Sequence, residues 1–124
     1  MGCNYGGGLN RLDTAFIAEI DNEIIGVVRI CQEFTTTVLR GMQISKKWQH
    51  QNIGSRLLLL ASNCLETTPC YCLPYSYLER FYNKADFQKI NPNNAPDFLI
   101  NRYHQYLSIG LDCIIMLRFS ELKK

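Results

Sequence analysis

Hydrophobic and polar positions alternate along three successive stretches in the first third of the chain. Residues 14–20 (TAFIAEI) and 24–31 (IIGVVRIC) are rich in β-branched side chains, and a short Asp-Asn-Glu segment separates them, which predicts a hairpin. Residues 35–44 (TTTVLRGMQI) follow after a few polar residues. Apolar side chains near the end of this stretch fall on both faces, which is typical of a buried central strand. The pattern therefore predicts an antiparallel meander of three strands.

The apolar spacing changes to a helical period after this meander. Residues 52–65 carry apolar side chains three or four positions apart, which predicts an amphipathic helix, and a Thr-Thr-Pro sequence ends it. Residues 70–73 (CYCL) then predict a short apolar strand. Ser76 and Glu79 have the spacing of a capping box, in which each side chain satisfies a backbone amide at a helix start. They predict a second helix over residues 77–84.

The last third of the chain predicts one more helix and one more strand. Pro96 suits the first turn of a helix, and Gly110 is a natural stop at its end. Residues 111–119 (LDCIIMLRF) are apolar enough to form a final buried strand. This alternation of strands and helices predicts a single α/β domain with a mixed sheet over residues 14–124. Residues 1–13 remain a short N-terminal segment without a predicted element, for which disorder is one option.

The composition is that of a globular protein. Of the 124 residues, 47% are hydrophobic and 19% are charged, and the net charge is +2. So small a positive excess, without a stripe rich in Lys and Arg, argues against a nucleic-acid partner. No apolar run approaches the ~18 residues of a membrane span, and the N-terminus lacks the basic and apolar regions of a signal peptide. We therefore expect a cytoplasmic protein without nucleic-acid or membrane partners.

Six cysteines raise the question of a metal or redox site. Cys70 and Cys72 are two positions apart, which on a strand points both side chains to one face but does not match the Cys-x-x-Cys spacing of zinc or redox motifs. The histidines, His50 and His104, are distant from both in sequence. Cysteines within apolar runs pack as small hydrophobic residues, and these are Cys31, Cys64 and Cys113. We expect reduced core thiols and no metal, because a metal or redox protein would need clustered ligands.

Residues 46–60 (KKWQHQNIGSRLLLL) carry the strongest candidate chemistry. A polar loop without acidic residues leads through Gly54 into the first helix. The first amides of a helix have no internal acceptors and carry partial positive charge, so they can hold an anion such as a phosphate. Asn52 tolerates the positive φ of an anion-binding backbone nest. Three basic side chains would add attraction: Lys46, Lys47 and Arg56. From the local sequence alone, a capped helix with a solvated loop remains an alternative.

The same loop resembles a motif of the GNAT superfamily of N-acetyltransferases. In that family, a Gln/Arg-x-x-Gly-x-Gly/Ala sequence binds the pyrophosphate of an acyl-CoA. Gln49 takes the first position of the motif and Gly54 the last, whereas Asn52 stands where the family usually has its inner glycine. The resemblance therefore implies that this loop holds a CoA pyrophosphate.

A second segment, residues 78–87 (LERFYNKADF), is similar to a helix-to-strand segment of the same family. That segment usually ends in Phe-Tyr-x-x-x-Gly-Phe. Phe81, Tyr82 and Phe87 match it, and Asp86 replaces the glycine. The family's order of elements is preserved along the chain, which strengthens both matches.

The resemblance covers roughly residues 14–119 and implies a GNAT-like single domain. Its fold would be a mixed, mostly antiparallel central sheet with helices on both faces. The family's usual first strand and front helices precede the hairpin, and we expect them to be missing here. Because those helices help to wall the acceptor pocket, a homodimer is one way to complete it.

The implied activity is the transfer of an acetyl group from acetyl-CoA to a small-molecule or peptide amine, by direct attack on the thioester. Tyr82 corresponds to the family's tyrosine that protonates the leaving thiolate; the alternative is that it only packs in an aromatic cluster. The end of the third predicted strand and the loop after it would bind acetyl-CoA. The implied cofactor-binding residues are Met42, Gln43, Ile44, Gln49, His50, Gln51, Asn52, Ile53, Gly54 and Ser55.

The general base is not identified by the resemblance. Many family members have a glutamate on the corresponding strand, but this strand offers Arg40, Met42 and Gln43. Glu33 and Glu19 are alternatives between which the sequence gives no preference. The rival function is a catalytically impaired GNAT-like module that binds acyl-CoA or another protein.

Overall fold

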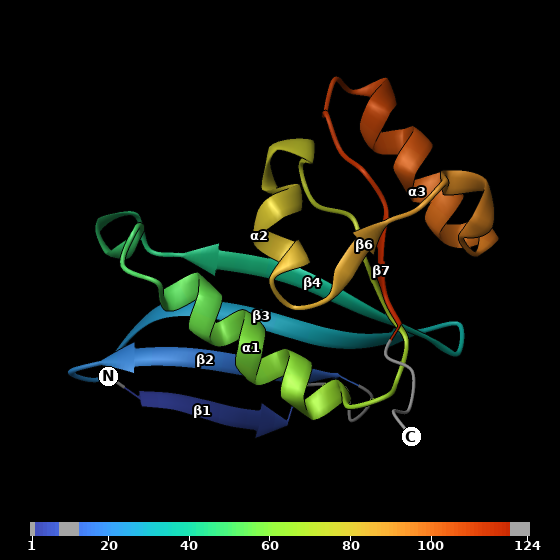
Figure 1. Ribbon diagram of the computed structural model, residues 1–124. Coiled ribbons are helices and arrows are strands. Elements are labelled where there is room, and N and C mark those ends of the chain that lie inside the picture. Colours follow the sequence, from blue (N-terminus) through green and yellow to red (C-terminus); the bar gives the residue numbers. More distant parts are fainter. Residues whose placement is uncertain (1, 8–12, 120–124) are drawn as a thin grey trace.

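The computed structural model describes residues 2–7 and 13–119. Within them, a seven-stranded mixed sheet has the strand order β1-β2-β3-β4-β5-β7-β6 (Figure 1). The strands are β1 (Gly2–Gly7), β2 (Thr14–Ile20), β3 (Glu23–Glu33), β4 (Thr36–Ile44), β5 (Cys70–Cys72), β6 (Phe87–Lys89) and β7 (Met116–Arg118). The helices are α1 (Ile53–Leu65), α2 (Glu79–Asn83) and α3 (Asp97–Ser108). All strand pairs except β4–β5 are antiparallel, which confirms the predicted mixed, mostly antiparallel sheet.

The first four strands form the predicted meander with one strand more than expected. β2, β3 and β4 pair antiparallel in sequence order. β1 pairs with β2, from Gly2 opposite Glu19 to Gly7 opposite Thr14, so the expectation that no strand precedes residue 14 is wrong. The segment lacks an alternating pattern, but the edge of β2 offers backbone donors and acceptors that any sequence can pair with. For residues 1 and 8–12, the predicted option of disorder falls outside the described part of the chain.

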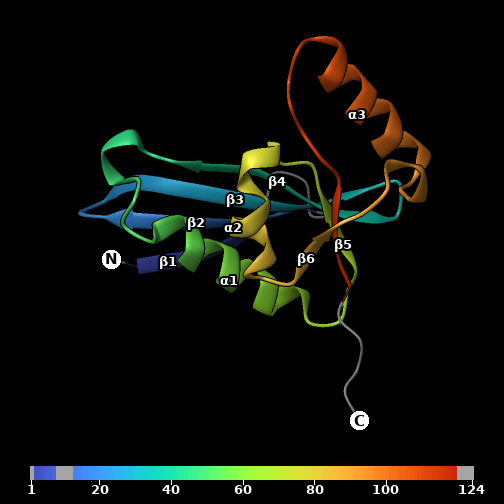
Figure 2. The same cartoon turned by 45° about the horizontal axis from the view of Figure 1, so that its top comes forward.

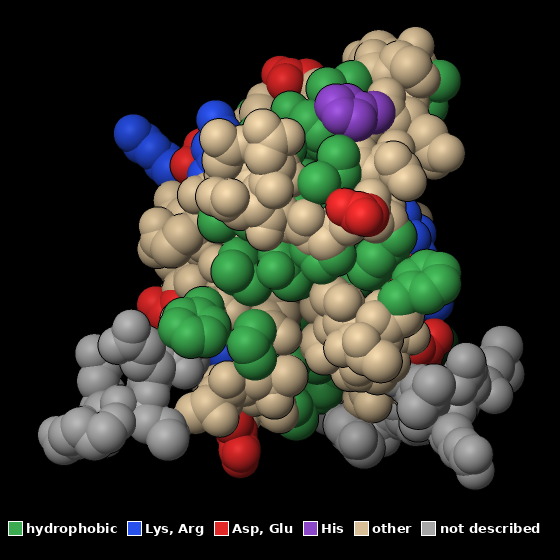
Figure 3. Space-filling model, turned by 90° about the vertical axis from the view of Figure 1, so that its right-hand side faces the viewer, with side chains coloured by type: hydrophobic (Ala, Val, Ile, Leu, Met, Phe, Trp, Pro, Cys, Tyr) green, Lys and Arg blue, Asp and Glu red, His purple; other side chains and the backbone are tan. Residues whose placement is uncertain are grey.

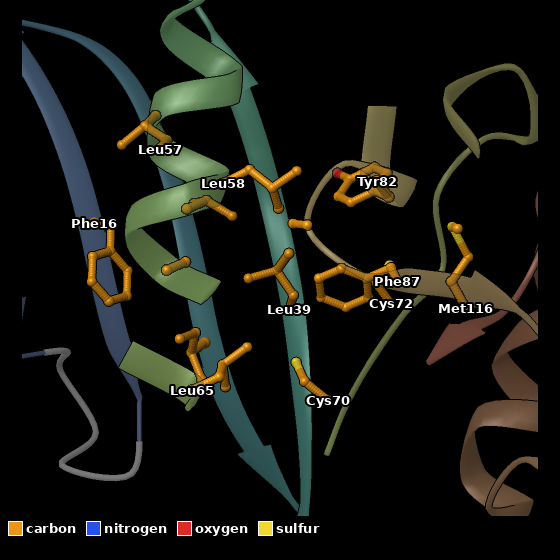
Figure 4. Packing of buried hydrophobic residues seen from close by; sticks show 14 of the residues in the cluster. Phe16, Leu39, Leu57, Leu58, Leu65, Cys70, Cys72, Tyr82, Phe87 and Met116 are labelled. Atoms are coloured by element: carbon orange, nitrogen blue, oxygen red, sulfur yellow. The ribbon is translucent and has the colours of Figure 1, made fainter. Parts of the chain in front are cut away.

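Helices cover both faces of the sheet, as predicted (Figure 2). Leu57 and Leu58 of α1 are fully buried against side chains of the first strands, among them Phe16 (Figure 4). On the opposite face, Leu99 of α3 packs against Val38 of β4. Each large apolar side chain buried in this way contributes about 1.5–3 kcal/mol to stability. The first half of the central strand β4, at Val38 and Leu39, is therefore enclosed on both sides, whereas its second half, Arg40 to Ile44, is only partly covered.

The second helix begins differently from the capping-box prediction. The Ser76 hydroxyl hydrogen-bonds to the Asp112 carboxylate at 2.7 Å and caps no helix. A 3₁₀ turn over Ser76–Leu78 comes before α2, which starts at Glu79. The prediction is wrong because a carboxylate distant in sequence competes successfully for the hydroxyl.

The third helix and the last strand occur where predicted, with shorter bounds. Pro96 is the residue before the helix rather than part of its first turn, and Gly110 (φ 89) follows the helix as expected. Of the stretch 111–119, strand β7 takes up Met116–Arg118 alone. Cys113, Ile114 and Ile115 before β7 are still buried, so the hydrophobic pattern correctly predicts their burial but not a continuous strand.

Large hydrophobic side chains also remain at the surface. Tyr77 is 79% exposed, Ile109 72% and Phe119 60%. On the face of the molecule seen in Figure 3, hydrophobic side chains run in a band across the middle. The homodimer that the sequence left open stays a prediction.

Candidate functional site

The sheet opens where β4 and β5 diverge. Val38 lies opposite Tyr71, and within the described residues this is the single pair in the parallel β4–β5 ladder. The rest of β4, up to Ile44, therefore has no strand partner on this side. A cleft of about 1070 Å³ lies here, lined by β4, the β4–α1 loop, the start of α1, β5, α2 and α3. Its volume suits a cofactor-sized ligand.

The loop before α1 has the backbone conformation of an anion-binding nest. His50 (φ 67) and Asn52 (φ 66, ψ 13) are both left-handed, on either side of Gln51. Alternation of left-handed and right-handed residues turns successive amides towards one side. The backbone amides of residues 50–55 donate to no acceptor in the part of the chain that the structure describes. We call residues 50–55 the amide nest, and it lies at the N-terminus of α1, where the sequence predicts it.

Hydrogen bonds at the start of the β4–α1 loop hold this loop against the sheet. The Ser45 amide donates to the Ile25 carbonyl at 2.7 Å, and Gln49 Nε2 donates to the Ile44 carbonyl at 3.1 Å. Trp48 packs against the main core. A left-handed non-glycine residue costs roughly 1–3 kcal/mol and persists where its surroundings hold it. Gln49, the first residue of the motif, supplies one of these restraints.

Two residues replace glycines of the family's motifs, and both have a left-handed backbone conformation. Asn52 has φ 66 and Asp86 has φ 72. After glycine, Asn and Asp adopt this region most readily, because their short polar side chains can hydrogen-bond locally. The two substitutions therefore keep the backbone conformation that glycine would have, which confirms the expected tolerance of Asn52 for positive φ.

Gly54 lies where α1 approaches α2. A Cβ at this position would be 3.4 Å from Phe81 Cζ and 3.7 Å from Ile44 Cγ1. Alanine would just fit, whereas a β-branched side chain would press on the Phe81 ring. Gly54 has no positive φ, so what it provides is space beside the cleft rather than conformational freedom.

Tyr82 joins the aromatic cluster of α2 and also lines the cleft. It is 6% exposed, and its ring packs edge-to-face with Phe81, with 5.0 Å between centroids. It packs in the same way with Phe87, which lies beside it in Figure 4, with 5.9 Å between centroids. Its hydroxyl makes no hydrogen bond within the described residues. Burial, followed by the neighbouring Cys72 thiol, raises the pKa of Tyr82 above its ordinary value. The phenol therefore stays protonated and has a free hydrogen to donate.

The predicted cofactor-binding residues gather around this cleft. Gln51 is exposed and does not line it. The other nine do, namely Met42, Gln43, Ile44, Gln49, His50, Asn52, Ile53, Gly54 and Ser55. Lys46, Lys47 and Arg56 are exposed beside the nest, and the first turn of α1 has no acidic residue. The surroundings of the nest therefore favour an anion.

Neither glutamate considered as a base lines the cleft. Glu33 Oε2 lies 3.2 Å from Arg40 Nη1, and its Oε1 lies 2.6 Å from Arg102 Nη2. Burial alone would raise the pKa of Glu33, but the hydrogen bonds and charges of Arg102 and Arg40 outweigh it, so that the pKa is lowered. An ionised carboxylate held by two cations is a weak base. Glu19 lies on β2, away from the cleft.

The sequence reasoning missed the residues at the opposite end of the cleft. Arg40 of β4 lines it together with Arg102 and Tyr106 of α3, and we call these three residues the α3 end of the cleft. Tyr75 and Tyr77 also line it, with their rings stacked 5.6 Å apart. No motif marks these side chains. Their position becomes visible once α3 is placed across the sheet.

The cysteines with described side chains are free thiols, but one prediction about them is wrong. Cys70 and Cys72 are both buried, as the strand periodicity predicts. Cys64 is exposed, because it falls on the solvent side of α1. Within the described residues, no three His, Cys, Asp or Glu side chains lie together as metal ligands. The Cys3 side chain lies outside the described part of the structure.

A family model for the acetyltransferase (GNAT) domain matches residues 11–89. The chain belongs to the GNAT acetyltransferase family. Membership supports acetyl transfer as its general activity. A comparison with curated proteins found no match. In the part of the chain that the structure describes, no helix has the length and apolar character needed to cross a bilayer.

Several solved structures share the fold. Escherichia coli ElaA is 18% identical, with a TM-score of 0.66 over 91% of this chain and 72% of its own. An aminoglycoside 6'-N-acetyltransferase complexed with coenzyme A is 12% identical, with a TM-score of 0.68 over 94% of this chain and 77% of its own. N-acetylglutamate synthase from Neisseria gonorrhoeae, complexed with coenzyme A and N-acetyl-glutamate, is 18% identical, with a TM-score of 0.67 over 87% of this chain. The match spans 26% of the length of that synthase.

Proposed function

We propose that this GNAT chain transfers an acetyl group from acetyl-CoA to an amine. The observation that carries the proposal is the amide nest, whose free donors open into the same cleft that Tyr82 lines. Two of the structurally similar acetyltransferases are complexes with coenzyme A, which supports the choice of cofactor. A nest of this kind at a helix N-terminus suits a pyrophosphate in particular, because several amides can share its oxygens.

In this proposal, the pyrophosphate lies on the amides of residues 50–55, and Lys46, Lys47 and Arg56 attract it from the rim. The pantetheine arm follows the unpaired edge of β4 at Met42–Ile44. The main-chain groups of that edge have no strand partner, because β5 has turned away from it, although the Ile44 carbonyl accepts from Gln49 Nε2. The arm then carries the thioester towards Tyr82, and His50 lies beside the phosphates or the ribose.

The chemistry requires a neutral amine to attack the thioester carbonyl carbon. The new C–N bond forms as the C–S bond breaks, and the electron pair of the broken bond goes to sulfur as a thiolate. Tyr82 donates a hydrogen bond to this sulfur, for which its raised pKa keeps it in the protonated form. The proton that the amine loses passes to water and finally balances the thiolate. No Asp or Glu lines the cleft within the described residues, so the amine enters already deprotonated.

Titration calorimetry of acetyl-CoA, CoA and desulfo-CoA against the purified protein tests the binding half of the proposal. We expect micromolar affinity for all three, because most of the binding energy comes from the nucleotide end. A folded protein that binds none of them would contradict the proposal.

Tyr82→Phe tests the catalytic half. We expect acetyl transfer to fall about 100-fold, the lower range for loss of a positioned proton donor, with CoA affinity within two-fold of the original. Tyr103→Phe is the matched control, since it removes a hydroxyl from α3 outside the cleft. Equal activity of Tyr82→Phe and the control would remove Tyr82 from the mechanism.

A second candidate is a GNAT-like module that binds acyl-CoA or another protein without turnover. The lack of a cleft carboxylate among the described residues favours it, because nothing there would deprotonate a protonated amine. This alternative predicts CoA binding without release of free thiol from acetyl-CoA by any amine, up to pH 9. Thiol release with any amine would exclude it.

A further inference from the structure

The α3 end of the cleft holds two arginines on one shared carboxylate. Arg40 comes from β4 and Arg102 from α3, and both line the cleft. Glu33 bridges them, at 3.2 Å from Arg40 and 2.6 Å from Arg102. The Glu33 side chain is 15% exposed and does not line the cleft, whereas the Arg40 and Arg102 side chains are 37% and 20% exposed. The Glu33 carboxylate therefore lies outside the cleft and holds the two guanidinium groups in position at its edge.

The charges at this end do not cancel. Two guanidinium groups against one carboxylate leave one net positive charge. Each guanidinium has five N–H donors, and its ion pair with Glu33 is its single hydrogen bond within the described residues. Arg29 lies opposite Arg40 on β3, with its Nε 3.5 Å from where a Cβ of Gly41 would stand. Its charge is offset by Asp13, which acts on the same Cys31 thiol as Arg29, Arg40 and Glu33, so one net positive charge remains. This end of the cleft therefore favours an anion and opposes a cation.

This anion site lies a fixed distance from the amide nest. Arg40 is four residues before Ile44 along β4, which spans at most about 13 Å, since the strand bulges at Gly41 (φ 69). The nest begins beyond the end of that strand, so one ligand group can occupy it while another contacts the arginines. Guanidinium groups recognise carboxylates through paired hydrogen bonds, which fixes orientation as well as charge.

We propose that the acceptor is a small amine that also carries a carboxylate, as an amino acid does, and that Arg102 and Arg40 bind this carboxylate. The inference rests on the proposed acetyl transfer and adds the substrate class. The arginines hold the carboxylate at the α3 end, and the free amine reaches the thioester beside Tyr82. The net positive charge at the α3 end repels polycationic amines, so we expect them to be poor acceptors.

The test compares matched pairs of amines with acetyl-CoA at pH 8.5. Each pair consists of an amino acid and its amide: glycine and glycinamide, β-alanine and β-alaninamide, glutamate and its α-amide. Free thiol is measured, and spermidine is included as a polycation. Because an amino acid holds its amine proton more tightly than its amide does, kcat/KM is calculated on the concentration of deprotonated amine. On that basis we expect a value about 10- to 100-fold higher for the carboxylated member of the accepted pair, as for a hydrogen-bonded charge pair. Equal or better use of the amide, or acetylation of none of the carboxylated amines, would overturn the proposal.

Two variants assign the preference to the arginines. Arg102→Gln and Arg40→Gln should raise KM for the carboxylated amine about ten-fold or more, with kcat and the use of its amide little changed. Arg40 is the more exposed of the two, so its variant remains informative if Arg102→Gln lowers the melting temperature. Arg80→Gln, exposed on α2 and outside the cleft, is the matched control. An unchanged KM in a folded Arg40→Gln protein would contradict the proposal.

Calorimetry with CoA separates this proposal from the proposed function. If the original protein binds no CoA, acetyl transfer fails as a whole. If it binds CoA and acetylates amines without regard to a carboxylate, the substrate class alone is wrong. If Arg102→Gln weakens CoA itself ten-fold, the arginines serve the cofactor, and the assignment to the acceptor is wrong.

Discussion

The two ends of the cleft attract anions by different physical means. At the amide nest, the donors are backbone N–H groups, and the residues that form it are defined by φ values and by the start of α1. At the α3 end, the donors are guanidinium groups carried on long side chains from two distant elements. Backbone donors are the same for any sequence that takes up the conformation, whereas side-chain donors change with each substitution.

This difference matches a division of labour in the proposed function. A cofactor shared by a whole family suits a site built from backbone, because such a site survives replacement of its inner glycine by Asn52. An acceptor particular to one protein suits a site built from side chains. The nest should therefore respond to changes in shape and φ, and the α3 end to changes in charge.

Gly54→Val should produce the greatest loss at the nest. The added methyl groups press on Phe81, which lies 3.4 Å from a Cβ at this position, and displace the first turn of α1. Overpacking of this kind costs roughly 1–3 kcal/mol, so we expect CoA affinity to fall up to about 100-fold in calorimetry. Gly54→Ala is the control and should bind within a few-fold of the original. Unchanged affinity in Gly54→Val would show that this turn does not hold CoA.

Asn52→Val tests the nest through its backbone conformation. A β-branched residue at φ 66 is strongly disfavoured, so we expect the loop to rearrange and CoA affinity to fall about ten-fold. Asn52→Gly removes the strain and should bind CoA at least as well as the original. If both variants bind equally well, the left-handed conformation at this position is not needed for the cofactor.

Glu33→Gln changes the charge of the α3 end without touching the nest. It frees Arg40 and Arg102 from their internal partner and adds one net positive charge. We expect kcat/KM for a carboxylated amine to rise about two- to five-fold, with CoA affinity unchanged. A large loss of activity in a folded protein would instead show that the positioning of Arg40 and Arg102 by Glu33 outweighs the added positive charge.

The pH dependence of stability gives the smallest of these effects. The pKa of Glu33 is held below its ordinary value of 4.5, so the unfolded chain binds more protons than the folded one just below that value. This contribution to stability is present above about pH 4.5 and is lost as pH falls through the folded pKa. The melting temperature of Glu33→Gln should therefore lie below the original at pH 6 and approach it near pH 3. A constant difference across this range would show that the ion pairs do not stabilise the fold.

Local sequence predicted the elements and the nest, for local reasons. The hairpin, β4 and α1 follow from periodicity, and the loop after β4 lacks acidic residues and places Asn52 at a left-handed position and Gly54 where α1 approaches Phe81. Where a distant group competes, local sequence fails. Ser76 bonds Asp112 instead of capping a helix, and residues 2–7 pair with β2 without any hydrophobic pattern.

The α3 end of the cleft could not be predicted in this way. Arg40 and Arg102 are 62 positions apart in the sequence (102 − 40), and neither belongs to a motif. They meet because α3 packs across the sheet through Leu99 and Val38, and because Glu33 is placed to bridge them. A backbone site depends on a few neighbouring φ values. The residues that form it are therefore adjacent in the sequence and can be recognised there. A side-chain site depends on which surfaces pack together, and that packing arises from the whole core.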